Sequence, residues 1–122
     1  MHAICETFAF RRAAKDAGLS DDEIADLVDY LSRNPMAGDE IVGTGGCRKV
    51  RVAAKSKSKG KSGGYRTITF FSGADLPLFL ITVFAKGERA DLSQRERNGL
   101  GEMCKVLVEE YRKKVVKVRA GA

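Results

Sequence analysis

The sequence predicts an α+β fold, with a small antiparallel sheet of three to four strands, two helices before it and one helix after it. Capping signals and helical apolar spacing mark both ends of the chain, and alternating or β-branched runs fill its middle. Short connections separate the later strands. Such connections join antiparallel neighbours, so we expect hairpins with the helices packed on one face of the sheet.

The two N-terminal helices are predicted from their ends. Thr7 is placed to cap a short helix that Gly18 would end. Ser20 and Glu23 have the spacing of a capping box, and apolar residues then recur every three or four positions as far as Asn34. The second segment is therefore predicted to be an amphipathic helix.

Three strands are predicted in the middle of the chain. Residues 47–53 alternate, with valines on one side and Lys49 and Arg51 on the other. Residues 65–71 are rich in β-branched and aromatic side chains, and residues 78–85 are almost entirely apolar, as in a central strand covered on both faces. We expect residues 3–5 to add an edge strand.

The last helix is predicted to begin after Ser93. Ser93 and Glu96 repeat the capping-box spacing, and apolar side chains follow at helical spacing as far as Tyr111. Residues 113–122 leave two alternatives open, a flexible tail or an extra strand. At 122 residues, the whole chain (1–122) is expected to form a single domain.

Composition excludes several classes of protein. The chain has no apolar run near the roughly 20 residues of a membrane span and no signal pattern, which favours the cytoplasm and no membrane partner. Three widely spaced cysteines predict reduced, buried thiols. His2 is the only histidine, so a zinc site or a histidine-dependent triad is improbable, and we expect no metal and no cofactor.

The positive charge is concentrated in one segment. The formal net charge is +6, yet between Glu40 and Asp75 there are eight basic residues and no acidic one, so the rest of the chain is slightly negative. These eight are Arg48, Lys49, Arg51, Lys55, Lys57, Lys59, Lys61 and Arg66. A concentrated positive field attracts polyanions, and the segment therefore indicates nucleic acid as a partner.

The basic residues divide between strands and a loop. Lys49 and Arg51 share one face of their strand, Arg66 opens the next strand, and Lys86 and Arg89 follow the apolar strand, so adjacent strands would bring five cations to one surface. The alternatives are purely structural roles, a salt bridge from Arg89 to a neighbouring acidic residue and a contact from Arg66 to a loop carbonyl.

The loop 55–64, KSKSKGKSGG, is expected to contact phosphates of RNA or DNA. The predicted RNA-binding residues are Arg48, Lys55, Lys57, Lys59 and Lys61. Gly60 to Ser62 match the last three residues of the phosphate-binding P-loop motif. The first glycine of that motif is missing, however, and a strand is predicted where the motif requires a helix. A solvated hairpin loop is the remaining alternative.

Three blocks of sequence resemble one known family. GTGGCRKVRVA (43–53), GKSGGYRT (60–67) and FAKGERADLS (84–93) are similar to RelE-type toxins of bacterial type II toxin–antitoxin modules, in the HigB-like branch of the RelE/ParE superfamily. The resemblance implies a RelE-like fold and a small ribonuclease that inhibits translation by cutting mRNA on the ribosome. It also implies a cognate antitoxin, expected to be a small helix-turn-helix protein. Gly87 stands where well-known members have an arginine, and a tyrosine of those members that stacks or donates a proton is replaced near Ser93, which leaves the proton donor open.

This resemblance suggests how cations alone could cleave RNA. RNA carries its own nucleophile, the 2′-hydroxyl, so an enzyme must align it, transfer protons and stabilise the charge on phosphate. Arg66 and Arg89 are the expected phosphate ligands, Lys49 and Lys86 the proton-transfer candidates, and Arg51 a support for either. The alternatives are a ParE-like toxin that inhibits DNA gyrase and cuts no nucleic acid, or an inactive nucleic-acid-binding module.

Overall fold

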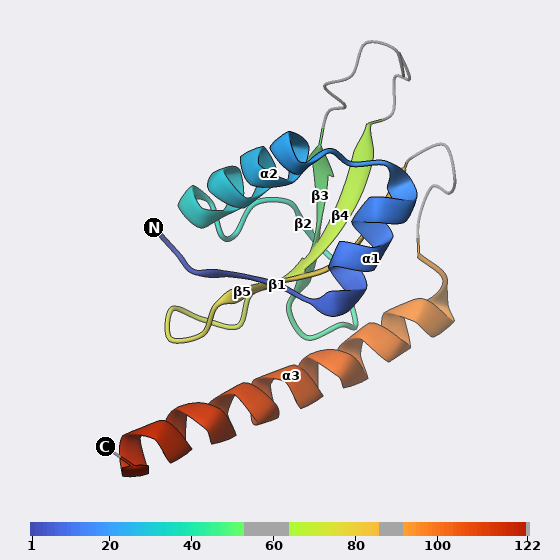
Figure 1. Cartoon of the computed structure of the whole chain (residues 1–122). Helices are drawn as coiled ribbons and strands as arrows, with labels where there is room; N and C mark the ends of the chain where they lie inside the picture. Colours follow the sequence, from blue (N-terminus) through green and yellow to red (C-terminus); the bar gives the residue numbers. More distant parts are fainter. Residues whose placement is uncertain (53–63, 86–91, 122) are drawn as a thin grey trace.

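The computed structural model describes residues 1–52, 64–85 and 92–121, with side chains as far as Lys113. The elements in chain order are β1 (Ile4–Glu6), α1 (Phe8–Ala17), α2 (Asp21–Arg33), β2 (Asp39–Glu40), β3 (Cys47–Val52), β4 (Tyr65–Phe70), β5 (Leu78–Ala85) and α3 (Gln94–Gly121). The predicted α+β class, with two N-terminal helices and one C-terminal helix around a sheet, is confirmed (Figure 1).

The sheet has five strands in the order β1-β5-β4-β3-β2, at least one more than expected. β1 is the predicted edge strand and runs parallel to β5, whereas the other pairs are antiparallel. The additional strand, β2, has only two residues, too few for an alternating pattern to reveal it. The predicted central strand is confirmed, because six of the eight residues of β5 are buried.

Helices cover both faces of the sheet, which corrects the expectation that all of them pack on one face (Figure 1). On the α1/α2 face, Phe10 and Leu27 pack with Leu80 in one core cluster. On the α3 face, Leu100 and Phe79 belong to a second cluster. A strand that is apolar along its whole length has two sides to bury, so helices on one face would leave the other exposed to water.

The predicted caps are present at all three helices. The Thr7 side chain accepts a hydrogen bond from the Phe10 N–H at 3.1 Å, and Gly18 ends α1 with a φ of 82°. Ser20 forms the capping box of α2. At α3 the Ser93 hydroxyl accepts from the Glu96 N–H at 3.2 Å, while the Ser93 N–H donates to the Glu96 carboxylate at 2.9 Å.

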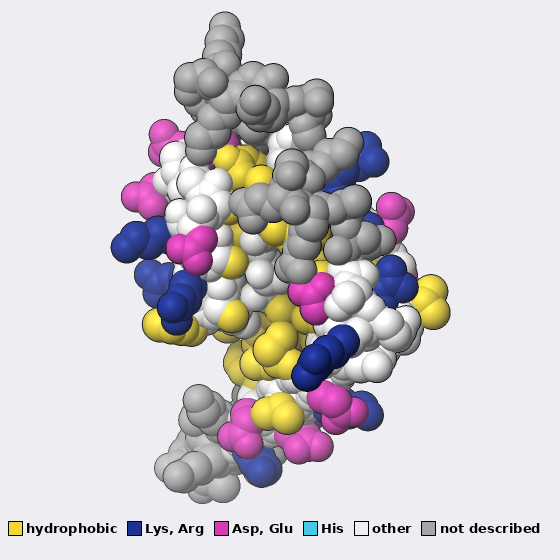
Figure 2. All heavy atoms as spheres, turned by 90° about the vertical axis from the view of Figure 1, so that its right-hand side faces the viewer, with side chains coloured by type: hydrophobic (Ala, Val, Ile, Leu, Met, Phe, Trp, Pro, Cys, Tyr) yellow, Lys and Arg dark blue, Asp and Glu magenta, His cyan; other side chains and the backbone are white. Residues whose placement is uncertain are grey.

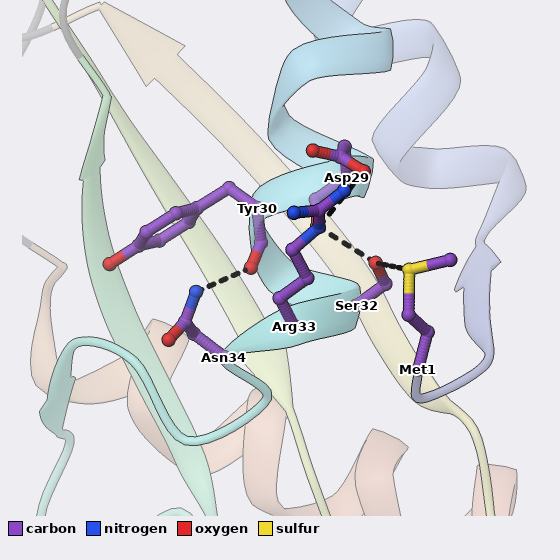
Figure 3. A network of polar contacts seen from close by, with 6 residues as sticks. All are labelled: Met1, Asp29, Tyr30, Ser32, Arg33 and Asn34. Carbon is purple, nitrogen blue, oxygen red and sulfur yellow. Dashed lines mark hydrogen bonds and ion pairs between the residues drawn. The ribbon is translucent and has the colours of Figure 1, made fainter.

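The C-terminal end of α2 holds the start of the chain (Figure 3). The Asn34 side-chain amide donates to the Tyr30 carbonyl at 3.0 Å and closes the last turn. The Ser32 hydroxyl lies 3.5 Å from the Met1 sulfur, and the His2 N–H donates to the Ser32 carbonyl at 2.7 Å. The strand that follows this terminus, β1, pairs with β5 at the edge of the sheet.

α3 is longer than expected. The helix continues through residues 113–121, so both alternatives for this segment, a flexible tail and an extra strand, are wrong. Tyr111 packs edge-on against Phe79, with 6.1 Å between ring centroids, and Arg112 forms an ion pair with Asp75 at 3.6 Å. In the described ranges, no helix is both long enough and apolar enough to cross a membrane.

Candidate nucleic-acid interface

Strand pairing brings three of the predicted cations together. Arg51 on β3 lies directly opposite Arg66 on β4, and Lys49 lies opposite Ile68. Directly opposed residues of an antiparallel pair point to the same side of the sheet. Ile68 belongs to the core cluster on the α3 face, so Lys49, Arg51 and Arg66 all stand on that face.

The residues between these cations point to the other side. Val50 is 3% exposed and Tyr65 is 4% exposed, and both pack in the cluster under α1 and α2. The predicted alternation along β3 is therefore confirmed. Tyr65, although it precedes Arg66 in the sequence, lies on the opposite face of the sheet from it.

The three cations differ in burial. Arg66 is only 6% exposed, Lys49 is half-buried and Arg51 is exposed. Arg66 therefore holds its guanidinium at a defined position in the sheet. A fixed charge shielded from water acts on a nearby phosphate more strongly than a mobile surface charge. We call Lys49, Arg51 and Arg66 the cation row.

Arg48 is separated from the cation row. Alternation places it on the α1/α2 side, opposite Thr69 on β4, and its guanidinium donates to the Gly38 carbonyl at 3.3 Å. The structure thus turns this predicted RNA-binding residue away from Lys49 and Arg51, its neighbours in the sequence.

Strand pairing also places two carboxylates that the sequence did not single out. β2 sets Asp39 opposite Lys49 and Glu40 opposite Arg48. Both acids precede the acid-free segment in the chain and are exposed. Asp39 therefore borders the cation row at its outer edge beside Lys49, whereas Glu40 lies beside Arg48 on the other side of the sheet. No sequence signal indicated this, because it depends on a strand of two residues.

The other predicted site residues lie outside the described residues. They are Lys55, Lys57, Lys59, Lys61, Lys86 and Arg89. The strands that lead to them end close together, since Val52, Tyr65 and Ala85 pair in one row across β3, β4 and β5.

A cavity of about 660 Å³ opens at the other end of the α3 face, between α3 and the turn at Gly43 to Gly45. Phe70 and Cys104 are among its lining residues, and the Cys104 sulfur lies 3.3 Å from that of Cys47. The hydrogen bond between the two thiols, together with burial, raises the pKa of Cys104 far above its usual range. Cys104 is therefore a neutral thiol with little nucleophilic character.

The three cysteines are unbridged; the prediction of buried thiols is confirmed for Cys47 and Cys104 and wrong for Cys5, which is half-buried. Within residues 1–52, 64–85 and 92–121, no three His, Cys, Asp or Glu side chains gather as metal ligands. Hydrophobic side chains continue from the body of the molecule to the last helix on the side shown in Figure 2, bordered by charged side chains of both signs.

The fold and the cation row define a small α+β protein with a charged sheet face suited to a phosphate backbone. Comparison with protein families identifies it further. Residues 2–121 match the family of the RelE toxin of the RelE/RelB toxin–antitoxin system, and the chain belongs to this family. It is therefore a toxin of a type II toxin–antitoxin system, a family generally made of ribonucleases, and the system implies a cognate antitoxin as its partner.

Proposed function

We propose that this toxin is a metal-independent, ribosome-dependent mRNA endonuclease of the HigB-like branch. The observation that carries the proposal is the direct pairing of Arg51 with Arg66, with Lys49 on the same face of the sheet. Two guanidinium groups that start from directly opposed positions on one face of a sheet offer several donors to the same phosphate backbone, which supports an RNA-binding role for this pair.

The proposed chemistry assigns each cation a task. Arg66, fixed and nearly buried, would stabilise the charge that grows on the phosphate oxygens as the 2′-hydroxyl attacks. Lys49 and Lys86 would transfer protons, and Arg89 would bind the same phosphate. Arg51, which is exposed, would hold the RNA backbone beside them.

The ribosome is the proposed docking partner as well as the place where mRNA is presented. Lys55, Lys57, Lys59 and Lys61 add four charges within seven residues, which suits ribosomal RNA as a polyanion. The antitoxin is proposed to be a small helix-turn-helix protein encoded beside the toxin. Its co-expression should restore growth to cells that produce the toxin, and failure to do so would contradict this assignment.

The test compares cleavage of an mRNA by the purified toxin in a reconstituted translation reaction and as naked RNA, with cut sites mapped by primer extension. We expect cuts only when the mRNA is translated, and we expect Arg66→Gln and Lys86→Gln each to lower the rate by about 100-fold or more. Arg33→Gln is the control, because this exposed arginine pairs with Asp29 on α2.

Three outcomes would contradict the proposal. Equal cutting of naked RNA would indicate a free-standing nuclease, and wild-type rates in both site variants would remove the cations from the mechanism. DNA damage in producing cells with intact transcripts would instead select the ParE-like alternative.

A further inference from the structure

Two buried thiols meet where the last helix passes the start of β3. The sulfur atoms of Cys47 and Cys104 lie 3.3 Å apart and share a hydrogen bond, although the two residues are 57 positions apart in the chain. Cys47 is the first residue of β3, and Cys104 lies within α3. Neither thiol belongs to the cation row, so the proposed RNA chemistry leaves this pair without a role.

The backbone fixes both partners of this pair. The Cys47 N–H donates to the Thr44 hydroxyl at 3.1 Å, and the Cys47 carbonyl accepts from the Ile41 N–H at 2.8 Å. On the helix side, α3 passes close to the same turn, because a Cβ added at Gly101 would lie 3.5 Å from the Gly43 carbonyl oxygen. The two sulfurs are therefore held together by hydrogen-bonded elements on both sides.

The cavity of about 660 Å³ beside α3 leads to the pair. Cys104 is among its lining residues, and the Cys104 sulfur is in direct contact with that of Cys47. Hydrogen peroxide is only slightly larger than water, whose share of liquid volume is about 30 Å³, so the cavity easily admits it. A small oxidant can thus approach both thiols while the protein stays folded.

The two thiols differ in acidity. The hydrogen bond from Cys104 lowers the pKa of Cys47, and the same hydrogen bond together with burial raises the pKa of Cys104. The shared proton therefore belongs to Cys104, and Cys47 is the sulfur that reacts as a thiolate. An acidic thiol with a second thiol beside it is the arrangement of reversibly oxidised cysteine sites.

We propose that Cys47 and Cys104 form a redox modification site, at which a peroxide converts the two thiols to a disulfide between β3 and α3. In the first step the Cys47 thiolate attacks a peroxide oxygen, so that an S–O bond forms, the O–O bond breaks and hydroxide leaves as water with a proton from solvent. In the second step the Cys104 sulfur attacks the Cys47 sulfur. An S–S bond then replaces the S–O bond, and the departing hydroxide takes the Cys104 proton. The two sulfurs lose two electrons, and one hydrogen peroxide is reduced to two waters.

The disulfide would tie α3 to the strand that carries Lys49 and Arg51. A link between residues 57 positions apart restricts the unfolded chain, so the oxidised protein should unfold at a higher temperature than the reduced protein. Thiol reductants would reverse the change. This inference stands independently of the proposed function, because it needs only the fold and the two thiols.

Cys5 is an internal control. It lies in the same row of the sheet as Cys47, but Phe79 on β5 and Phe70 on β4 stand between them. Three strand spacings of about 4.8 Å place the two backbones roughly 14 Å apart. A disulfide requires Cα atoms within about 7 Å, so Cys5 cannot pair with Cys47 in the folded protein.

The first test uses the wild-type toxin. The reduced protein is treated with hydrogen peroxide, its remaining thiols are alkylated, and a tryptic digest is analysed by mass spectrometry without reduction. The three cysteines fall in different tryptic peptides. We expect the Cys47 peptide to be joined to the Cys104 peptide, with Cys5 alkylated, and we expect dithiothreitol to separate the two.

The same oxidation in urea is the control for geometry. An unfolded chain should give mixed pairings that include Cys5, whereas the folded protein should give one pairing. Alkylated Cys47 and Cys104 after oxidation of the folded protein would overturn the inference. The same mixture of pairings in both conditions would also overturn it.

The second test compares melting temperatures of the reduced and oxidised proteins. The oxidised wild type should melt about 10 °C higher, and dithiothreitol should abolish the difference. Cys104→Ala should show no such increase, and Cys5→Ala is the matched control that should keep it. An increase of equal size in Cys104→Ala, or a linked wild-type protein that melts below its reduced form, would contradict a pair positioned for this bond.

Discussion

The two faces of the sheet are built from the same strands but have different roles. On the α1/α2 face, Val50 and Tyr65 are buried with Leu80 under two helices. On the α3 face, Ile68 is buried under the last helix, but the next row of the sheet sets Arg51 and Arg66 beside the buried Phe84. Alternation along β3 and β4 lets neighbouring residues serve either the core or the charged surface.

The difference shows how a small sheet can carry concentrated charge. The α1/α2 face supplies a mostly apolar layer under two helices, so the α3 face can hold like charges at one end at a tolerable cost in stability. Substitutions on the α1/α2 face should therefore change the free energy of unfolding, whereas substitutions in the cation row should change activity.

The largest expected effect is on the α1/α2 face. Leu80 is fully buried in the central strand β5, and Leu80→Ala should lower the free energy of unfolding by about 2–5 kcal/mol through lost burial and a cavity. Urea denaturation measures this change in the free energy of unfolding. Arg66→Gln on the α3 face should lower cleavage far more than stability, and a comparable stability loss in both variants would break the comparison.

Gly38 tests the support of the cation row from β2. Its φ is +95°, and a Cβ at this position would lie 2.5 Å from the Lys49 carbonyl oxygen. Gly38→Ala should cost about 3 kcal/mol and displace β2 from β3. Gly43→Ala is the matched control, since Gly43 has a φ of +85° with open space around it and should cost only about 1 kcal/mol. Equal melting temperatures for the two variants would argue against the close contact.

The α1/α2 face also contains a buried hydroxyl group among its apolar side chains. Thr67 lies between Val50 and Val83 in the sheet, and its Oγ1 is buried without a hydrogen-bond partner among the described residues. Thr67→Val should therefore raise the free energy of unfolding by about 1–2 kcal/mol.

Thr44→Val is the control with the opposite sign. The Thr44 hydroxyl donates to the Ile41 carbonyl at 2.7 Å and accepts from the Cys47 N–H at 3.1 Å, so its loss should cost about 1–3 kcal/mol. Thermal denaturation of both variants measures these two changes in stability. A destabilised Thr67→Val would mean that the Thr67 hydroxyl has a hydrogen-bond partner in solution.

The smallest expected effect on stability is in the cation row itself. Arg51→Glu replaces a repulsive pair with an attractive one opposite Arg66, and should raise the free energy of unfolding by up to about 1 kcal/mol, less at high salt. The same change should abolish cleavage. Arg51→Gln should lie between wild type and Arg51→Glu in both measurements, and a stability loss in either variant would contradict repulsion at this pair.

The sequence by itself determined the local structure. Capping boxes at Ser20 and Ser93 and the glycine after α1 predicted the helix ends, because these signals satisfy backbone groups within a few residues. Alternation predicted that Lys49 and Arg51 share a face while Val50 points to the core. It also showed that the positive charge is concentrated in one segment.

Only the tertiary structure decided how distant segments meet. Placement of α3 on the face opposite α1 and α2, the short strand β2 with Asp39 beside Lys49, and the turning away of Arg48 all depend on pairing between residues far apart in the chain. Such pairing is set by which faces must be buried together, a property of the whole sheet and of no single segment.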